Sequence, residues 1–314
     1  MAPTPLAFVF PGQGSQSVGM LGELANAHPQ ARAAFDEASS GAALDLWDLA
    51  QGGPEEQLNR TEFTQPALLA ADVAAWRAWR AAGGAQPAQF AGHSLGEYAA
   101  LVAAGALSLG EGARLVRERG RLMQSAVPAG QGAMAAIIGA DDALIEEVCR
   151  AVSNDTVVVP ANFNSPGQTV IGGHADALDR ALAELGERGV RKTVKLAVSV
   201  PSHTPLMRDA ARALGEFMHT LSWRMPDRPV IQNADAAAHD SVEKIIDALV
   251  RQLYLPVRWT QCVQALAAGG ATRLVECGPG KVLTGLAKRI DKALDARALG
   301  TPADFDAVLA DNKE

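Results

Sequence analysis

The sequence predicts an α/β fold with a mostly parallel sheet and a second, smaller unit inserted into it. Near both ends of the chain, short apolar segments alternate with amphipathic helical segments, a pattern typical of a parallel sheet covered by helices. In the middle of the chain the order changes to strand, helix, strand, strand, helix, strand. The chain has 314 residues, enough for one large domain and one smaller domain.

The first part of the chain supplies two strands of the predicted parallel sheet. Leu6–Phe10 is an apolar run that ends at Pro11 and a glycine-rich loop, so we expect a buried strand there. The elements predicted after it are a second strand at residues 89–91 and helices at residues 31–38, 64–80, 97–104 and 111–126.

The middle of the chain has the βαββαβ order of a ferredoxin-like unit. Strands are expected at residues 133–138, 156–161, 169–171 and 191–198, and helices at residues 141–152 and 174–186. Proline-containing loops flank this stretch on both sides. We therefore expect a small domain at residues 128–198, inserted into a large domain made of residues 1–127 and 199–314.

The alternating pattern resumes after the insertion. Strands are expected at residues 230–231 and 273–276, and helices at residues 242–254 and from residues 205 and 282 onward. The last residues are expected to form a loosely held tail.

Composition excludes several classes of function. The formal net charge of −7 argues against nucleic acid or a membrane surface as the main partner. No apolar stretch approaches the roughly 20 residues of a membrane span, and the N-terminal apolar run lacks the basic flank of a signal peptide. The three cysteines, Cys149, Cys262 and Cys277, are scattered, so we expect reduced thiols in a cytoplasmic protein. No histidine–carboxylate cluster has metal-ligand spacing, and we predict no metal.

A serine between two glycines marks the junction of the second predicted strand and its helix. The spacing Gly92-x-Ser94-x-Gly96 fits a sharp strand–turn–helix elbow that exposes the hydroxyl of a nucleophilic serine. The helix N-terminus behind such a serine stabilises negative charge on an attacked carbonyl. The other interpretation is an ordinary N-cap serine with glycines that ease the turn.

His203 is the histidine that best fits a general base for this serine. His93 immediately precedes Ser94, so its side chain is expected to point away from the hydroxyl. His203 lies between a predicted strand and a helix that begins with Thr204 as N-cap and Pro205 in the first turn, a boundary that would hold the ring in a cleft. From the spacing alone, a loop histidine in solvent remains equally open.

Arg119 lies on the apolar face of its predicted helix. At about 100° per residue, the other arginines of that helix share the opposite face. A guanidinium on an apolar stripe is costly without an anionic partner. We favour a fork that binds a substrate carboxylate over an internal acid partner or a side chain that reaches past the stripe to solvent.

These residues lie in segments that resemble the malonyl-CoA:acyl carrier protein transacylases over almost the whole chain. The matching segments are FVFPGQGSQ (8–16), TQPAL (64–68), GHSLGEYAAL (92–101), RGRLMQ (119–124), GAMAAIIG (132–139), NFNSPGQ (162–168), VPSH (200–203), LVRQLYLPVRWT (249–260) and ECGPGKVLTGL (276–286). The resemblance implies an α/β-hydrolase-like core and ping-pong transfer of a malonyl group for fatty acid synthesis. It implies malonyl-CoA and the phosphopantetheine arm of acyl carrier protein as partners, with no cofactor of the enzyme's own.

The resemblance also implies roles for individual residues. Ser94 would be the nucleophile, His203 the base and acid, and Arg119 the ligand of the malonyl carboxylate. The backbone N–H groups of Gln13 and Leu95 would form the oxyanion hole. The backbone carbonyl of Gln252 would orient the histidine. Polar positions near the substrate channel match Gln65, Asn162, Asn164 and Gln168, and Ser202 fits the malonyl-selective members. Leu255 departs from the family pattern, where a polar residue is expected, and this affects no catalytic role.

Three other functions stay open at this point. A serine esterase or thioesterase of α/β-hydrolase type usually carries its acid between the serine and a histidine near the C-terminus. Here 111 residues follow His203, and most acids between Ser94 and His203 fall in the inserted unit. A discrete polyketide acyltransferase shares the same core, and a non-catalytic acyl-binding protein could keep the fold.

Overall fold

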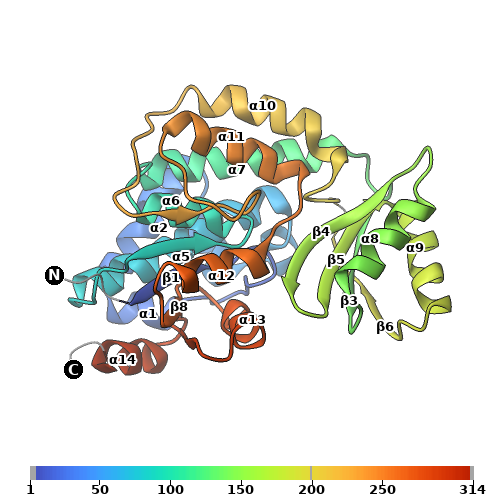
Figure 1. Ribbon diagram of the computed structural model, residues 1–314. Helices are drawn as coiled ribbons and strands as arrows, with labels where there is room; N and C mark the ends of the chain where they lie inside the picture. Colours follow the sequence, from blue (N-terminus) through green and yellow to red (C-terminus); the bar gives the residue numbers. More distant parts are fainter. Residues whose placement is uncertain (1–4, 199, 312–314) are drawn as a thin grey trace.

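Two separate sheets organise the protein in a computed structural model that describes residues 5–198 and 200–311 (Figure 1). The larger sheet has the order β7-β2-β1-β8-β9, and every pairing in it is parallel. Its strands are β1 (Leu6–Phe10), β2 (Gln89–Gly92), β7 (Val230–Ile231), β8 (Arg273–Glu276) and β9 (Asp295–Ala298). The predicted parallel sheet is confirmed.

The central strand β1 shows how alternation along one strand builds two cores. Leu6, Phe8 and Phe10 pack into the larger hydrophobic cluster, whereas Ala7 and Val9 belong to a second cluster. Side chains of successive strand residues point to opposite faces, so both faces of the sheet are covered by helices.

Helices flank this sheet on both faces. They are α1 (Gly22–Ala27), α2 (Pro29–Ala42), α3 (Leu46–Gly52), α4 (Glu55–Leu58), α5 (Thr61–Ala81), α6 (Gly96–Ala103), α7 (Leu109–Ala126), α10 (Arg208–Met218, after a 3₁₀ turn at Pro205–Met207), α11 (Val242–Tyr254), α12 (Trp259–Ala268), α13 (Val282–Ile290) and α14 (Pro302–Asp311). In α5, the buried Trp76 packs edge-on against Phe8 and Phe90 of the sheet. None of the helices in the described ranges is long and apolar enough to span a membrane.

The smaller sheet is antiparallel and has the order β4-β5-β3-β6 (Figure 1, right). Its elements are β3 (Gly132–Ile138), α8 (Asp142–Val152), β4 (Val158–Ser165), β5 (Gln168–His174), α9 (Ala175–Glu187) and β6 (Lys192–Lys195). The βαββαβ order and this strand arrangement are those of a ferredoxin-like unit, as predicted. The division at 127/128 and 198/199 stays a prediction.

The two helices of this unit cover only one face of its sheet. Ala135, Ile137 and Ile171 pack with the helices, whereas Met134 and Val170 point to the other face. Strand β4 also pairs with Val257, which lies between α11 and α12. The Val257 N–H donates to the Ala161 carbonyl, and the Val257 carbonyl accepts from the Phe163 N–H. The helix-free face of the small sheet is thereby held beside the end of the large sheet.

Several elements differ from the prediction. The strand expected at residues 156–161 runs from Val158 to Ser165, and the one expected at 191–198 ends at Lys195. The elements that were not predicted are α1, α3, α4, α12, β9 and α14. Residues 312–314 lie outside the described part of the chain, and the loosely held tail expected at the last residues does not include residues 295–311. There β9 pairs with β8, and the fully buried Phe305 of α14 contacts Trp79 and His28.

Candidate active site

The turn between β2 and α6 has the geometry of the predicted elbow. Ser94 has a φ of 52°, in the left-handed region that side chains rarely adopt. A Cβ on Gly92 would lie 1.9 Å from the Gly96 carbonyl carbon, and one on Gly96 would lie 2.0 Å from the Phe10 carbonyl oxygen. Only glycines allow the strand, the turn and the helix to approach this closely. Ser94 is therefore held in a strained position just before the N-terminus of α6.

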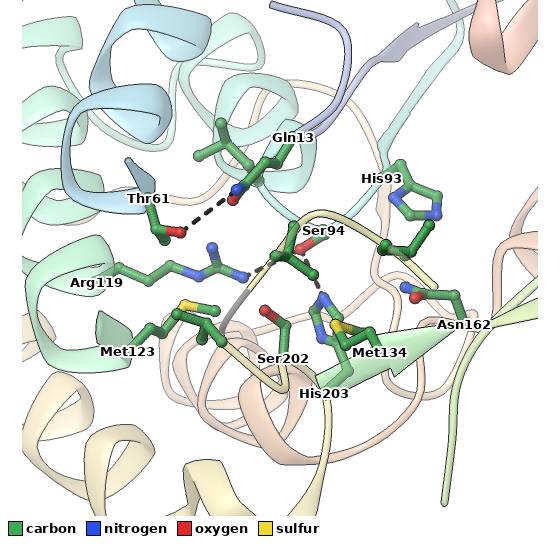
Figure 2. Close-up of a pocket in the computed structure, with 14 residues that line it drawn as sticks. Gln13, Thr61, His93, Ser94, Arg119, Met123, Met134, Asn162, Ser202 and His203 are labelled. Carbon is green, nitrogen blue, oxygen red and sulfur yellow. Dashed lines mark hydrogen bonds between the residues drawn. The ribbon is translucent and has the colours of Figure 1, made fainter. Parts of the chain in front are cut away.

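Ser94 and His203 lie in direct contact although they are 109 positions apart in the sequence (Figure 2). The distance between Ser94 Oγ and His203 Nε2 is 2.7 Å, and that between His203 Nδ1 and the Gln252 carbonyl oxygen is also 2.7 Å. The ring is buried, with 3% of the residue exposed, so the interpretation of a solvent-exposed loop histidine is wrong. Because Nδ1 faces a carbonyl, it carries the proton, and Nε2 is left to accept one from Ser94.

His203 is uncharged at neutral pH. Burial, and secondarily the positive charge of Arg119, lowers its pKa to about 3. Thr204 occupies the N-cap position and Pro205 the first turn of the following 3₁₀ helix, as predicted, but the Thr204 hydroxyl donates to the Pro201 carbonyl and does not cap the helix. The neutral imidazole is the form that can act as a base.

Arg119 reaches the same point from α7. It is 1% exposed, and its Nη2 lies 3.2 Å from Ser94 Oγ and 2.9 Å from Gln252 Oε1, while Nη1 donates to Gln65 Oε1 at 2.8 Å. All of these partners are neutral. Among the described residues no carboxylate forms an ion pair with Arg119, and its Nε has no acceptor. A buried cation next to the hydroxyl is thus available to a small anion.

Gln13 and Leu95 lie beside Ser94 and have backbone N–H groups that are free among the described residues. Gln13 lies on the loop after β1, Leu95 follows Ser94, and both line the same cavity as Ser94, His203 and Arg119. Within residues 5–198 and 200–311, neither backbone N–H donates to another residue. Two free backbone donors beside a serine hydroxyl can hold an oxyanion.

The cavity at Ser94 lies between the two sheets. Its volume is about 120 Å³. The face of the small sheet that carries no helices contributes Met134 and Asn162, and the segment after β6 contributes Leu196 and Val198. The loops and helices around the large sheet thus supply Ser94, His203 and Arg119. The small unit supplies much of the opposite wall of the cavity, which is mostly apolar (Figure 2).

The remaining polar positions are only partly gathered at this site. Gln65 contacts Arg119, and Asn162 and Ser202 line the cavity. Asn164 holds His93, whose Nε2 lies 2.8 Å from Asn164 Oδ1. Gln168 is not among the lining residues and instead accepts a hydrogen bond from Arg289 at the surface.

Two buried residues behind the elbow were missed in the sequence. Asn233 accepts from the Ser94 N–H at 2.7 Å and donates to the Gly92 carbonyl at 2.7 Å, which clamps both sides of the turn. Glu97 accepts hydrogen bonds from the Asn233 backbone and from Gln252. Asn233 lies two residues after β7, near the carboxyl end of a parallel strand where sites are common. Glu97 is an acid within the otherwise apolar helix α6. Both signals could have found them.

Comparisons with known proteins place the chain in one family. A family model described as an acyl transferase domain matches residues 7–300. The malonyl CoA-acyl carrier protein transacylase of Salmonella typhimurium is 52% identical over 306 residues, which cover 98% of this chain and 99% of the relative. The crystal structure of the malonyl-CoA:acyl carrier protein transacylase of Xanthomonas oryzae pv. oryzae matches with a TM-score of 0.98 and 68% identity, covering 99% of each chain.

One similar structure contains a partner protein. It is described as a type II PKS acyl-carrier protein in complex with its malonyl-transacylase. This chain matches it with a TM-score of 0.96 and 50% identity, covering 98% of this chain and 100% of that chain.

Proposed function

This chain belongs to the acyltransferase family of malonyl-CoA:acyl carrier protein transacylases, and from that membership we propose how its residues carry out the reaction. The enzyme transfers a malonyl group from malonyl-CoA to the phosphopantetheine thiol of acyl carrier protein for fatty acid synthesis. The observation that carries the residue assignment is the contact of Ser94 Oγ with both His203 Nε2 and the Arg119 guanidinium.

In the first half-reaction the malonyl group moves to the enzyme. His203 Nε2 takes the proton of Ser94 Oγ, and the oxygen attacks the thioester carbonyl carbon. The backbone N–H groups of Gln13 and Leu95 stabilise the negative oxygen of the tetrahedral intermediate. As the intermediate collapses, the carbon–sulfur bond breaks, and His203 returns its proton to the departing sulfur of coenzyme A.

In the second half-reaction the same groups act in reverse order. The phosphopantetheine thiol gives its proton to His203 and attacks the carbonyl of the malonyl-serine ester. The carbon–oxygen bond then breaks, and Ser94 Oγ recovers the proton. The Gln252 carbonyl replaces the acid of a catalytic triad, since it orients the ring and fixes the proton on Nδ1.

Arg119 selects the substrate and tunes the base. Its guanidinium binds the malonyl carboxylate, which gives the buried cation an anionic partner. The charge of Arg119 is one cause of the low pKa of His203. A bound carboxylate offsets that charge and raises the pKa of His203, so the base becomes stronger when malonyl, and not acetyl, occupies the site.

The proposal includes where the protein acts and how it is divided. We place it in the cytoplasm, which is supported by the free, buried thiols of Cys149, Cys262 and Cys277. We assign the reactive groups to a large domain of residues 1–127 and 199–314, and the opposite wall to a small domain of residues 128–198.

A covalent adduct tests this function. Wild-type enzyme incubated with malonyl-CoA is expected to gain one malonyl group in its intact mass and to release it to acyl carrier protein. Ser94→Ala is expected to stay folded and form no adduct, because an elbow hydroxyl contributes little to packing. Ser125→Ala, which removes a serine hydroxyl at the end of α7, is the matched control and keeps the adduct.

Two outcomes contradict the proposal. An adduct that persists in Ser94→Ala places the nucleophile elsewhere. Release of mostly free malonate, with little malonyl carrier protein, supports the esterase or thioesterase function instead.

A further inference from the structure

Glu97 is a fully buried acid directly behind the reacting groups. It is the second residue of α6, three positions after Ser94. We propose that Glu97 is a positioning residue: it accepts a hydrogen bond from the Gln252 side chain, fixes the direction of that amide and thereby holds the Arg119 guanidinium in place. This role rests on the proposed function, in which Arg119 binds the malonyl carboxylate.

The contacts of Glu97 lead to the site by two routes, through the Gln252 side chain to Arg119 and through Asn233 to the elbow at Ser94. Its Oε2 accepts from Gln252 Nε2 at 3.0 Å and from the Asn233 N–H at 2.7 Å, and its Oε1 accepts from Gln232 Nε2 at 3.0 Å. Among the described residues no Arg, Lys or His forms an ion pair with Glu97. Arg119, the closest cation in the network, is linked to it across Gln252.

The Gln252 amide has only one orientation in which every donor faces an acceptor. Its NH₂ group donates to Glu97 Oε2 and to the Ser94 carbonyl at 2.9 Å, so its Oε1 faces Arg119 Nη2. Rotation by 180° would place an oxygen against two oxygens and an NH₂ group against the guanidinium. Glu97 Oε2, together with the Ser94 carbonyl, therefore keeps an acceptor in front of Arg119.

Gln252 serves the base as well, but with a different atom. Its backbone carbonyl accepts from His203 Nδ1. Loss of the side-chain amide leaves this carbonyl in place, so the two functions of Gln252 can be separated by substitution. The side chain affects the malonyl carboxylate site, whereas the backbone affects every acyl substrate.

The ionisation of Glu97 gives a second, independent readout. Burial raises the pKa of Glu97 to about 7, against the opposing effect of its hydrogen bonds and of Arg119. The other titratable or charged groups that interact with it are Arg119 on α7, Tyr98 on α6 and Cys262 on α12. Burial raises the pKa of both Tyr98 and Cys262 far above neutrality. Glu97 is thus the member of this group that changes charge near pH 7.

The sign of the pH effect follows from the hydrogen bonds. Ionised Glu97 accepts from Gln252, whereas the protonated acid must place a donor among donors. Malonyl transfer by the wild type is therefore expected to fall as the pH decreases through about 7. Glu97→Gln removes the titrating group, so this acid limb should be absent in the variant.

The experiment measures kcat/KM for malonyl-CoA and acetyl-CoA from pH 5.5 to 8.5, with acyl carrier protein as acceptor. Residues that orient metal ligands through hydrogen bonds typically affect activity by about 10–100-fold, and we expect a similar range for Glu97. Glu97→Gln should lower malonyl transfer within that range, lower acetyl transfer less, and lose the acid limb. Glu276→Gln is the matched control, because Glu276 is also buried and accepts backbone hydrogen bonds, but at the start of α13. It should leave the malonyl-to-acetyl ratio unchanged.

A double-mutant cycle separates positioning from general destabilisation. Gln252→Leu keeps the backbone carbonyl and deletes the amide, so it should also lose the acid limb. If Glu97 acts through that amide, Glu97→Gln combined with Gln252→Leu is no slower with malonyl-CoA than Gln252→Leu alone. Gln252→Leu alone tests the acid limb should Glu97→Gln fail to fold.

Three results would overturn the role of Glu97. They are an unchanged malonyl-to-acetyl ratio in Glu97→Gln, an acid limb that persists in either single variant, and fully additive losses in the double variant. A wild-type enzyme that forms no malonyl adduct would instead refute the proposed function.

Discussion

Asp72 is a buried acid outside the site whose two carboxyl oxygens have no hydrogen-bond partner among the described residues. It lies within α5, and a Cβ on Gly278 would lie 2.1 Å from its Oδ1. Burial, and secondarily the negative charge of Glu276, raises the pKa of Asp72 well above its usual value. In the folded protein the Asp72 carboxyl group therefore stays protonated at pH values at which it is ionised in the unfolded chain.

This single residue makes stability depend on pH. In the unfolded chain Asp72 ionises near pH 3.9, so the folded state loses stability as the pH rises from there toward the raised pKa. Asp72→Asn keeps the shape but cannot ionise. Its free energy of unfolding relative to wild type is expected to increase from pH 5 to pH 8, measured by denaturant titration at each pH. A difference that is the same at both pH values contradicts this prediction.

The proposed catalytic residues differ in how far the sequence alone could identify them. The sequence identifies Ser94 because the tight elbow requires a glycine two positions before it and another two positions after it. It identifies Arg119 because an arginine on the apolar face of a helix needs an anionic partner. His203 also has a positive φ, of 62°, but no local pattern distinguished it from a loop histidine. Its burial depends on α11, whose Gln252 is 49 positions away.

Gln13, Leu95 and Gln252 came only from the family resemblance. Their proposed roles belong to backbone atoms, and a backbone N–H or carbonyl has no side-chain signature in a sequence. Glu97 and Asn233 were missed for a related reason, since their importance lies in hydrogen bonds between elements distant in the chain.

At the scale of elements, the elbow between β2 and α6 depends on close backbone packing. Gly92→Ala would place a methyl group 1.9 Å from the Gly96 carbonyl carbon, so the turn must shift. We expect a loss of about 1–3 kcal/mol of stability together with loss of the malonyl adduct. Both are measurable by denaturant unfolding and intact mass.

A helical glycine provides the matched control. Gly285 lies within α13, and a Cβ added there meets nothing within 4 Å. Gly285→Ala should stabilise the protein by about 0.5–1 kcal/mol and keep the adduct. Equal effects of the two substitutions would show that the elbow has no special packing requirement.

Most elements of the fold were predictable because their periodicity is strong and local. Val242–Tyr254 and Arg273–Glu276 have the predicted bounds, and the order of the βαββαβ unit was read correctly. The short helices α1, α3 and α4 have too few turns to show a periodic pattern. Strand β9 and helix α14 are stabilised by β8 and by the α5 side chain Trp79, contacts that a local pattern cannot reveal.

At the scale of the whole molecule, the formal net charge is −7. The family resemblance leads us to expect an acidic carrier protein, which a chain of this net charge would repel. The predicted docking surface is a local basic patch, either Arg188, Arg191, Lys192 and Lys195 or Lys281, Lys288 and Arg289. Ion pairs already engage three of these, since Arg188 pairs with Glu147 and Glu184, Lys195 with Asp179 and Lys281 with Asp304. Arg191 and Lys192 of the first patch and Lys288 and Arg289 of the second form no ion pair with any described residue, so each patch keeps two cations free for a carrier.

Charge reversal tests this surface. Arg191→Glu combined with Lys192→Glu should raise the KM for the carrier at low salt, with a smaller effect at high salt because screening weakens charge steering. Adduct formation from malonyl-CoA should not change. If reversal at both patches leaves the carrier KM unaltered at low salt, docking does not depend on them.

In the proposed mechanism, the assembled site owes its selectivity for malonyl to a buried cation, Arg119, that forms no ion pair with the described residues. Arg119 reaches Ser94 from α7, is held by Gln252 from α11, and has no carboxylate partner among the described residues. The malonyl carboxylate would supply that partner, and without Arg119 it would enter a buried site uncompensated.

The ratio of kcat/KM for malonyl-CoA to that for acetyl-CoA, in the wild type and in Arg119→Ala, tests this most directly. Loss of a buried charge partner costs about 3–5 kcal/mol, so malonyl transfer should fall by about two to four orders of magnitude. Acetyl transfer should hold steady or rise, and Arg119→Lys should restore malonyl transfer poorly because an ammonium lacks the two-point fork. A melting curve identifies any variant that is merely unstable. An unchanged malonyl-to-acetyl ratio in folded Arg119→Ala would contradict the account.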